Sequence, residues 1–197
     1  MLGIFLDIET NGLNFFKHRS LEIAFKIVNL YDGIVLDHLN EVILQPLEIW
    51  EKSDLKSLKV NGFTWEMVLK GKPEKEVADQ ILISFQKHSI KRFDAVFICQ
   101  NPSFDRIFFA QMIDPDQQEM LKWPYHWLDL ASMYWGSIME NAMKQNLSFP
   151  WEKGLSKDSI AHDLKISEEK KPHRAINGVD HLILCYKNVI GFPFAQG

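Results

Sequence analysis

Residues 4–13 have the sequence Ile4-Phe5-Leu6-Asp7-Ile8-Glu9-Thr10-Asn11-Gly12-Leu13, an apolar run that leads into two carboxylates at alternate positions. Because successive side chains of a strand point to opposite faces, Asp7 and Glu9 lie on one face, about 7 Å apart. Two like charges on a buried strand repel each other and are costly to desolvate. A divalent cation between them would offset that cost. The alternative is an ordinary strand end before a glycine turn, with both acids solvated.

Length and charge limit the class of protein. The chain has 197 residues, enough for a single domain over residues 1–197 with a sizeable core. No apolar run approaches the roughly 20 residues that span a bilayer, so we expect no membrane association. The first strand is too short, and lacks the basic flank, to be a secretory signal. The net charge of −4 argues against a large nucleic-acid footprint but leaves room for a small one bridged by metal.

The two cysteines, Cys99 and Cys185, both lie in apolar stretches. We therefore expect buried free thiols, which suit a reducing cytoplasm. Their spacing matches no zinc site.

The first part of the chain has the pattern of a β-meander. Residues 21–28 and 34–45 are predicted strands, and Tyr31-Asp32-Gly33 is a hairpin turn signal between them. Residues 47–59 are polar and have no clear period. The acidic strand therefore comes first of three meandering strands.

Strands and helices alternate in the rest of the chain. Thr64 and Ser156 are expected helix caps, and Pro73 suits the first turn of a helix. Strands are predicted at 95–99 and near 127–130, each followed by a helix, with a loop at 148–154 and a final helix over 175–190. The expected fold is one α/β domain.

Several motifs recur in a fixed order along this frame. D-x-E-T-x-G-L is present at 7–13, E-I-A at 22–24 and N-G-F-T at 61–64. Further along, N-x-x-F-D-x-x-F is present at 101–108, D-L at 129–130 and H-x-A at 173–175. Together these motifs resemble the DEDDh 3′–5′ exonucleases, the family of the proofreading subunit of bacterial DNA polymerase III and of ribonuclease T. The N-G-F-T turn departs from the family's H-G-I-T by having Asn61 in place of histidine.

The resemblance implies a ribonuclease H-like fold, with a central mixed sheet flanked by helices. It implies a metal-dependent enzyme that removes nucleoside monophosphates from the 3′ ends of single-stranded DNA or RNA, using two Mg²⁺ or Mn²⁺ ions. Its partners would be a single-stranded 3′ end and either a DNA polymerase or a second copy of the chain. An oligoribonuclease-like scavenger of very short RNA is a further possibility within the family.

The resemblance also implies roles for individual residues. Asp7, Glu9 and Asp105 would bind metal, and His173 would be the general base, since its ordinary pKa suits proton uptake at neutral pH. Another explanation for Asp105 is that an acid in the first turn of a helix is favoured by the helix dipole. The residues expected to bind substrate are Thr10, Asn11, Gly12, Leu13, Asn101 and Phe104.

One position departs from the family pattern. The fourth acid of H-x-A-x-x-D is Gly178 here, and the nearest acid is Asp180. Two further residues correspond to about 200° of helix rotation, so Asp180 reaches the metals only if the helix begins late or residues 177–178 bulge. Asp180 is therefore either the fourth metal ligand or a solvated helix residue. The missing acid also supports a second hypothesis, a catalytically weak or inactive module that binds nucleic acid or a polymerase.

Two surface features complete the predicted site. Phe15 and Phe16 would stack on unpaired bases or belong to the core or a dimer contact, and we favour the core for at least one of them. A basic cluster near His173 would meet backbone phosphates or be solvated surface. Its members are Lys165, Lys170, Lys171 and Arg174.

Overall fold

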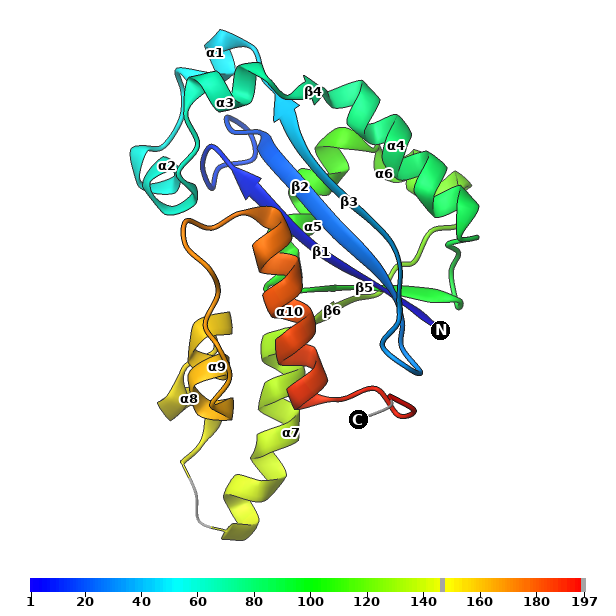
Figure 1. The fold of residues 1–197 in the computed structure, drawn as a ribbon, viewed down its shortest axis with the longest axis vertical. Helices are drawn as coiled ribbons and strands as arrows, with labels where there is room; N and C mark the ends of the chain where they lie inside the picture. Colours follow the sequence, from blue (N-terminus) through cyan, green and yellow to red (C-terminus); the bar gives the residue numbers. More distant parts are fainter. Residues whose placement is uncertain (146–147, 196–197) are drawn as a thin grey trace.

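A six-stranded mixed sheet of order β4-β3-β2-β1-β5-β6 forms the centre of the computed structural model, which describes residues 1–145 and 148–195 (Figure 1). The three meandering strands pair antiparallel, and β4, β5 and β6 each pair parallel with a neighbour. The strands are β1 (Leu2–Thr10), β2 (Ser20–Asn29), β3 (Val35–Leu44), β4 (Lys72–Pro73), β5 (Ala95–Cys99) and β6 (Trp127–Asp129). The predicted α/β architecture is confirmed.

Helices cover both faces of this sheet. One face packs against α4 and α5, and the other packs against α7, α9 and α10 (Figure 1). The helices are α1 (Leu47–Trp50), α2 (Leu55–Asn61), α3 (Trp65–Leu69), α4 (Glu74–Lys87), α5 (Pro102–Met112), α6 (Pro115–Met120), α7 (Leu130–Gln145), α8 (Pro150–Lys153), α9 (Lys157–Leu164) and α10 (Ala175–Val189).

The alternation of β1 divides its side chains between the two layers. Ile4, Leu6 and Ile8 are buried in the cluster that includes α4 and α5. Phe5 is buried in the cluster that includes α10, where its ring meets Tyr186 edge-on at 5.2 Å. Asp7 has the parity of Phe5, so the strand turns it toward α10.

The differences from the predicted elements are short helices and the two-residue strand β4, so that Pro73 precedes α4 and does not lie in its first turn. Residues 47–61 contain α1 and α2, although they show no apolar period. Asp54 explains α2, because its carboxylate accepts hydrogen bonds from the backbone N–H groups of Lys56 and Ser57. The expected loop at 148–154 contains α8, and α6 was not predicted. The final helix and the helices capped by Thr64 and Ser156 are confirmed, and both cysteines are buried and free.

The loop after β1 leaves its two aromatic side chains in solvent. Phe15 is 38% exposed and Phe16 is 80% exposed, and their rings lie 4.1 Å apart. The expectation that at least one of them belongs to the core is therefore wrong. The loop is short and is held from outside, since Gln111 of α5 donates to the Phe15 carbonyl.

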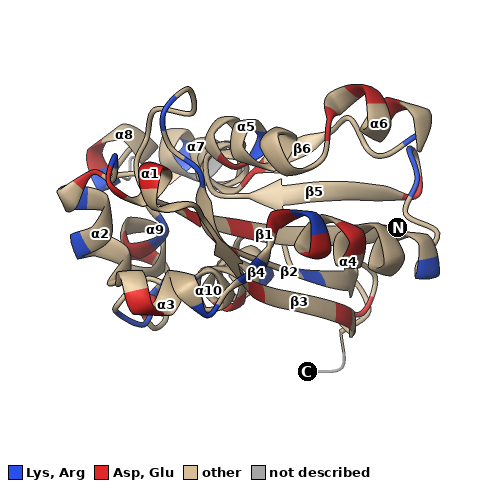
Figure 2. Cartoon of the chain, turned by 90° about the horizontal axis from the view of Figure 1, so that it is seen from above, with Lys and Arg blue, Asp and Glu red and all other residues tan. Residues whose placement is uncertain are grey.

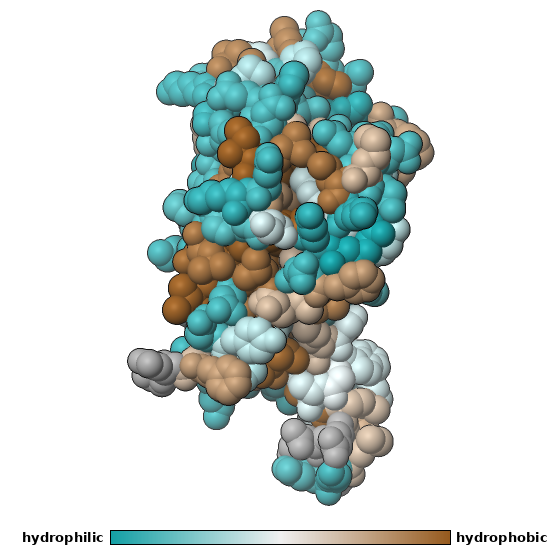
Figure 3. Space-filling view, turned by 90° about the vertical axis from the view of Figure 1, so that its right-hand side faces the viewer, coloured by the Kyte–Doolittle hydropathy of each residue, from teal (hydrophilic) through white to brown (hydrophobic). Residues whose placement is uncertain are grey.

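Charged and apolar residues are interspersed over the surface. Figure 2 shows basic residues on α2, at the end of the sheet where β1 ends, and acidic and basic residues side by side on α4. Figure 3 shows apolar patches separated by polar residues on the side of the molecule that carries α4.

Within residues 1–145 and 148–195, no helix has both the length and the apolar character that crossing a membrane requires. The single domain over residues 1–197 stays a prediction, since residues 146–147 and 196–197 lie outside the described part.

An aromatic cluster under β5 gives a test of the core. Phe97 is fully buried, stacks on Trp127 at 4.0 Å and meets Phe109 edge-on at 5.6 Å. Phe97→Ala should lower the free energy of unfolding by about 3–5 kcal/mol, because it leaves a cavity in this cluster. Phe93→Ala is the matched control, since Phe93 is 88% exposed and its loss should change stability by less than about 0.5 kcal/mol. Urea denaturation measures both, and equal effects would contradict this description of the core.

Candidate active site

Three carboxylates meet where β1 passes between α5 and α10. Asp7 and Glu9 come from β1, and the buried Asp105 comes from the first turn of α5. The Asp105 Oδ1 atom accepts a hydrogen bond from the backbone N–H of Ile8 at 3.1 Å. This hydrogen bond links α5 to β1. It holds Asp105, a residue of the first turn of α5, beside the acids of β1.

The carboxylates have raised pKa values because they are buried together. Burial is the main cause for Asp7, and the Glu169 carboxylate adds to it. Burial and the neighbouring Asp7 raise the pKa of Glu9 to about 8. Burial and Asp7 also hold the pKa of Asp105 well above its usual range. Raised pKa values mean that the ionised carboxylates are destabilised by burial and by mutual repulsion. A bound cation would stabilise their ionised forms.

Gly178 of α10 lies directly against Asp7. A Cβ atom at this position would come within 2.3 Å of Asp7 Oδ2 and 2.6 Å of its Cγ. Position 178 is thus on the helix face that points at the acidic strand, where the family motif has its fourth acid. Since Asp7 fills that space, α10 packs on β1 only because position 178 has no side chain.

A lysine that the sequence analysis missed lies beside the same acid. Lys157, the first residue of α9, has its side chain 13% exposed. Its Nζ atom lies 3.2 Å from Asp7 Oδ1 and 3.0 Å from Glu169 Oε2. Burial works against the ammonium, but these two carboxylates outweigh burial and raise the pKa of Lys157 above its ordinary value.

Glu169 links that lysine to the predicted general base. It is buried, and its Oε1 atom lies 3.0 Å from His173 Nδ1. Burial alone would raise the pKa of Glu169, but His181 and the Lys157 ammonium outweigh it and lower the pKa to about 2. The sequence gives little sign of this role for Glu169, because it belongs to a charged run before Pro172 that is typical of solvated surface. Its one distinguishing feature is its closeness in sequence to His173, four residues later.

The E-I-A motif anchors the N-terminus of α10. Glu22 of β2 is buried and accepts two hydrogen bonds from the Arg174 guanidinium, at 2.9 and 2.5 Å. It also accepts the backbone N–H of Ala175 at 2.8 Å, which satisfies a free donor of the first helical turn. Arg174 is therefore paired with Glu22 and lies over the Phe63 ring at 4.6 Å.

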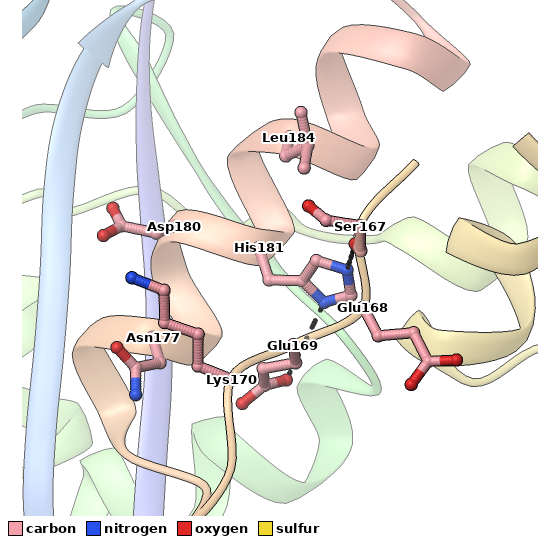
Figure 4. Close-up of a pocket in the computed structure, with 8 residues that line it drawn as sticks. All are labelled: Ser167, Glu168, Glu169, Lys170, Asn177, Asp180, His181 and Leu184. Carbon is pink, nitrogen blue, oxygen red and sulfur yellow. Dashed lines mark hydrogen bonds and ion pairs between the residues drawn. The ribbon is translucent and has the colours of Figure 1, made fainter. Parts of the chain in front are cut away.

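Asp180 does not join the carboxylates. It pairs with Lys26 of β2 and its side chain is 54% exposed. Figure 4 shows Asp180 on a different side of α10 from His181, whose ring lies between Ser167 and Glu169. The helix begins at Ala175 without a bulge, so the 200° rotation separates Asp180 from Asp7. We leave Asp180 out of the metal site proposed below.

The residues expected to bind substrate fall into two groups. Thr10, Leu13 and Phe104 line an open pocket of about 290 Å³ together with Glu9 and Lys56. This pocket places apolar and polar groups beside the acidic cluster.

The other predicted substrate residues are engaged in holding loops. Asn11 is buried, and its amide donates to the Ile49 carbonyl and to Ser53 Oγ. The Gly12 N–H donates to Thr10 Oγ1. Asn101, with φ 56°, forms the turn into α5, and its N–H donates to Asp129 Oδ1. The side-chain bonds of Asn11 account for that residue without a ligand, and Gly12 has no room for a side chain, because a Cβ there would meet His18 at 2.3 Å.

The donor set fits a hard divalent ion in part. Oxygen ligands at Asp7, Glu9 and Asp105 are the type that Mg²⁺ and Mn²⁺ prefer. Among residues 1–145 and 148–195, however, no three His, Cys, Asp or Glu side chains are grouped closely enough to enclose a metal ion.

Comparison with known proteins agrees with this geometry. The chain is 25% identical to ribonuclease T of Histophilus somni (strain 129Pt) over 203 residues, which is 96% of this chain and 87% of that protein. The nuclease domain of 3′hExo, a DEDDh family member bound to rAMP, has the same fold, with a TM-score of 0.68 at 10% identity over 98% of this chain and 94% of that one. The chain thus shares the fold of a DEDDh 3′–5′ exonuclease and is similar in sequence to a ribonuclease T, which agrees with the resemblance of its motifs.

A second solved structure extends the fold comparison. Exonuclease I from Methylocaldum szegediense matches with a TM-score of 0.71 at 16% identity. The match covers 98% of this chain but only 42% of exonuclease I, so the chain spans less than half of that protein. No protein-family model matches the chain.

Two helical glycines provide a matched test of the Asp7 contact. Gly178→Ala should destabilise the protein, because the new Cβ meets Asp7 at 2.3 Å and forces the helix or the carboxylate to move. Gly136→Ala in α7 has nothing within 4 Å of its Cβ and should stabilise the protein by about 0.4–1 kcal/mol. Thermal unfolding of the two variants should therefore shift in opposite directions, and a stabilising Gly178→Ala would contradict the close packing of α10 on Asp7.

Proposed function

We propose that the protein is a metal-dependent 3′–5′ exonuclease that hydrolyses the terminal phosphodiester bond of single-stranded DNA or RNA and releases nucleoside monophosphates. The observation that carries this proposal is the group of three acids, the buried Asp105 and the half-buried Asp7 and Glu9, with His173 held nearby by Glu169. Desolvating three neighbouring carboxylates costs free energy unless a cation pairs with them. Clusters of this kind with shifted pKa values are typical of active sites.

The acids and the histidine have separate tasks in this proposal. Asp7, Glu9 and Asp105 would hold Mg²⁺ or Mn²⁺, which when bound supplies electrostatic stabilisation of the charge that develops on the phosphate. His173 would take the proton from the attacking water. With its Nδ1–H donated to Glu169 Oε1, the ring presents Nε2 as the free base.

The pocket beside Glu9 is the proposed place for the terminal nucleotide. Leu13 and Phe104 offer apolar surface on which a base can pack, and Thr10 lies between them and the acids. Lys56 at the rim would meet the phosphate of a neighbouring nucleotide. Phe15 and Phe16, exposed on the adjacent loop, would stack on unpaired bases further along the strand.

Two solved structures of the same fold support a nucleic-acid substrate. One solved relative is E. coli exonuclease I in a zinc-bound complex with single-stranded DNA, and another is a 3′-exonuclease that recognises a histone mRNA stem-loop. For this chain we propose a single-stranded 3′ end as substrate, in the cytoplasm, with a DNA polymerase or a second copy of the chain as protein partner. The net charge of −4 is consistent with a footprint of few nucleotides.

A catalytically weak or inactive nucleic-acid-binding module is the second candidate function. The observation in its favour is Gly178, which leaves the acidic cluster without the fourth acid of the family motif. This candidate predicts oligonucleotide binding without turnover.

Removing an acid should separate these two functions. Asp7→Asn should lower the rate of 3′ trimming of a 5′-labelled oligonucleotide with Mn²⁺ by about 10²-fold or more, because the phosphate charge loses its main stabilising site. Asp180→Asn, a matched change on the surface of α10, should leave the rate within about twofold. Wild-type protein that binds the oligonucleotide but shows no laddering at high protein concentration would favour the inactive module.

Replacing the histidine tests the proton-transfer role. His173→Ala should lower the turnover rate by about 10²–10⁴-fold, the usual contribution of a general base. His162→Ala is the control, since His162 of α9 is not grouped with the acids. The rate of monophosphate release by each variant is the measurement, and a His173→Ala variant with wild-type turnover would remove His173 from the mechanism.

A further inference from the structure

The Lys157 ammonium is largely buried, and a buried charge costs free energy unless it is paired. Its side chain is 13% exposed, and its Nζ atom lies between Asp7 Oδ1 at 3.2 Å and Glu169 Oε2 at 3.0 Å. The Gly178 carbonyl is a third oxygen, at 3.5 Å. Three oxygens from β1, α10 and the segment before His173 thus converge on one positive charge.

The geometry around Asp7 limits what else can bind there. A Mg²⁺ ion lies about 2.1 Å from its carboxylate ligands. A divalent ion on the Lys157 side of Asp7 Oδ1 would therefore meet an ammonium already 3.2 Å from the same oxygen, and the two positive charges would repel strongly at that range. Gly178 of α10 covers the Oδ2 atom on its own side. Asp7 is left with its Glu9 side for a metal ion.

The lysine is also held in place from behind. Lys157 begins α9, whose N-terminus is capped by Ser156 Oγ accepting the Ser159 N–H at 3.1 Å. Glu169 is fixed by its second oxygen, which contacts His173 Nδ1 at 3.0 Å. The backbone that carries Lys157 and the Glu169 carboxylate that Lys157 contacts are therefore both fixed in position.

We propose that the Lys157 ammonium takes the place of the second cation of a two-metal site, so that the protein binds a single divalent ion through Asp7, Glu9 and Asp105. This inference rests on the proposed exonuclease function and narrows it. It revises the two ions that the family resemblance implies. It also accounts for Gly178, because a fourth acid is not needed where the second cation belongs to the chain.

Counting bound Mn²⁺ on the full-length chain tests the proposal without any measurement of activity. Free Mn²⁺ is quantified by electron paramagnetic resonance during a titration, with and without a nucleoside monophosphate. We expect one Mn²⁺ per chain in both conditions. Two per chain would overturn the proposal while leaving the exonuclease function in place, and no binding at all would overturn the metal-dependent function itself.

Variants of Lys157 test whether this lysine is what limits the protein to one Mn²⁺ ion. Lys157→Ala leaves Asp7 and Glu169 facing each other across the vacated space, so the count should rise from one to two. Lys157→Arg keeps the charge, and Lys153→Ala removes another half-buried lysine, paired with Asp163 at 2.7 Å. Both should keep a count of one. A Lys157→Ala protein that still binds one ion would overturn the role of Lys157, and the wild-type count decides the question if that variant does not fold.

Discussion

The packing of α10 against Asp7 is the constraint on which the rest of the site depends. Gly178 lets the helix approach the acidic strand so closely that a single added carbon would meet the carboxylate. That approach determines where His173, five residues earlier, enters the site. It also brings the Gly178 carbonyl to Lys157, so one glycine places a base, an acid and an ammonium relative to each other.

Glu22 maintains this arrangement from the other side of the helix N-terminus. Its two oxygens bind the Arg174 guanidinium and the Ala175 N–H, so the first turn of α10 is bound to β2 as well as packed on β1. Bidentate arginine–carboxylate contacts carry geometric specificity besides energy. The E-I-A motif is thus a structural support for the segment that carries His173.

Much of the fold and of the acidic cluster followed from local sequence. The alternation of residues 4–9 is enough to put Asp7 and Glu9 on one face of a strand, whereas Asp105 was brought to them by the motif resemblance. Lys157 could not be predicted in this way, because its partner Asp7 is 150 residues away. Glu169 could not be predicted either, because its partner Lys157 shows no sign in the sequence of belonging to the site. Phe15 and Phe16 were misplaced for a related reason: apolar character does not specify which short loop stays in solvent.

The ion pair between Lys157 and Asp7 has a consequence for how the site is maintained. A charge carried by a side chain cannot be removed by dilution or by a chelator, and it is present from the moment the chain folds. One side of Asp7 is therefore compensated in every molecule, whatever the metal supply around it. The charge balance on this side of Asp7 is thereby set by the polypeptide itself.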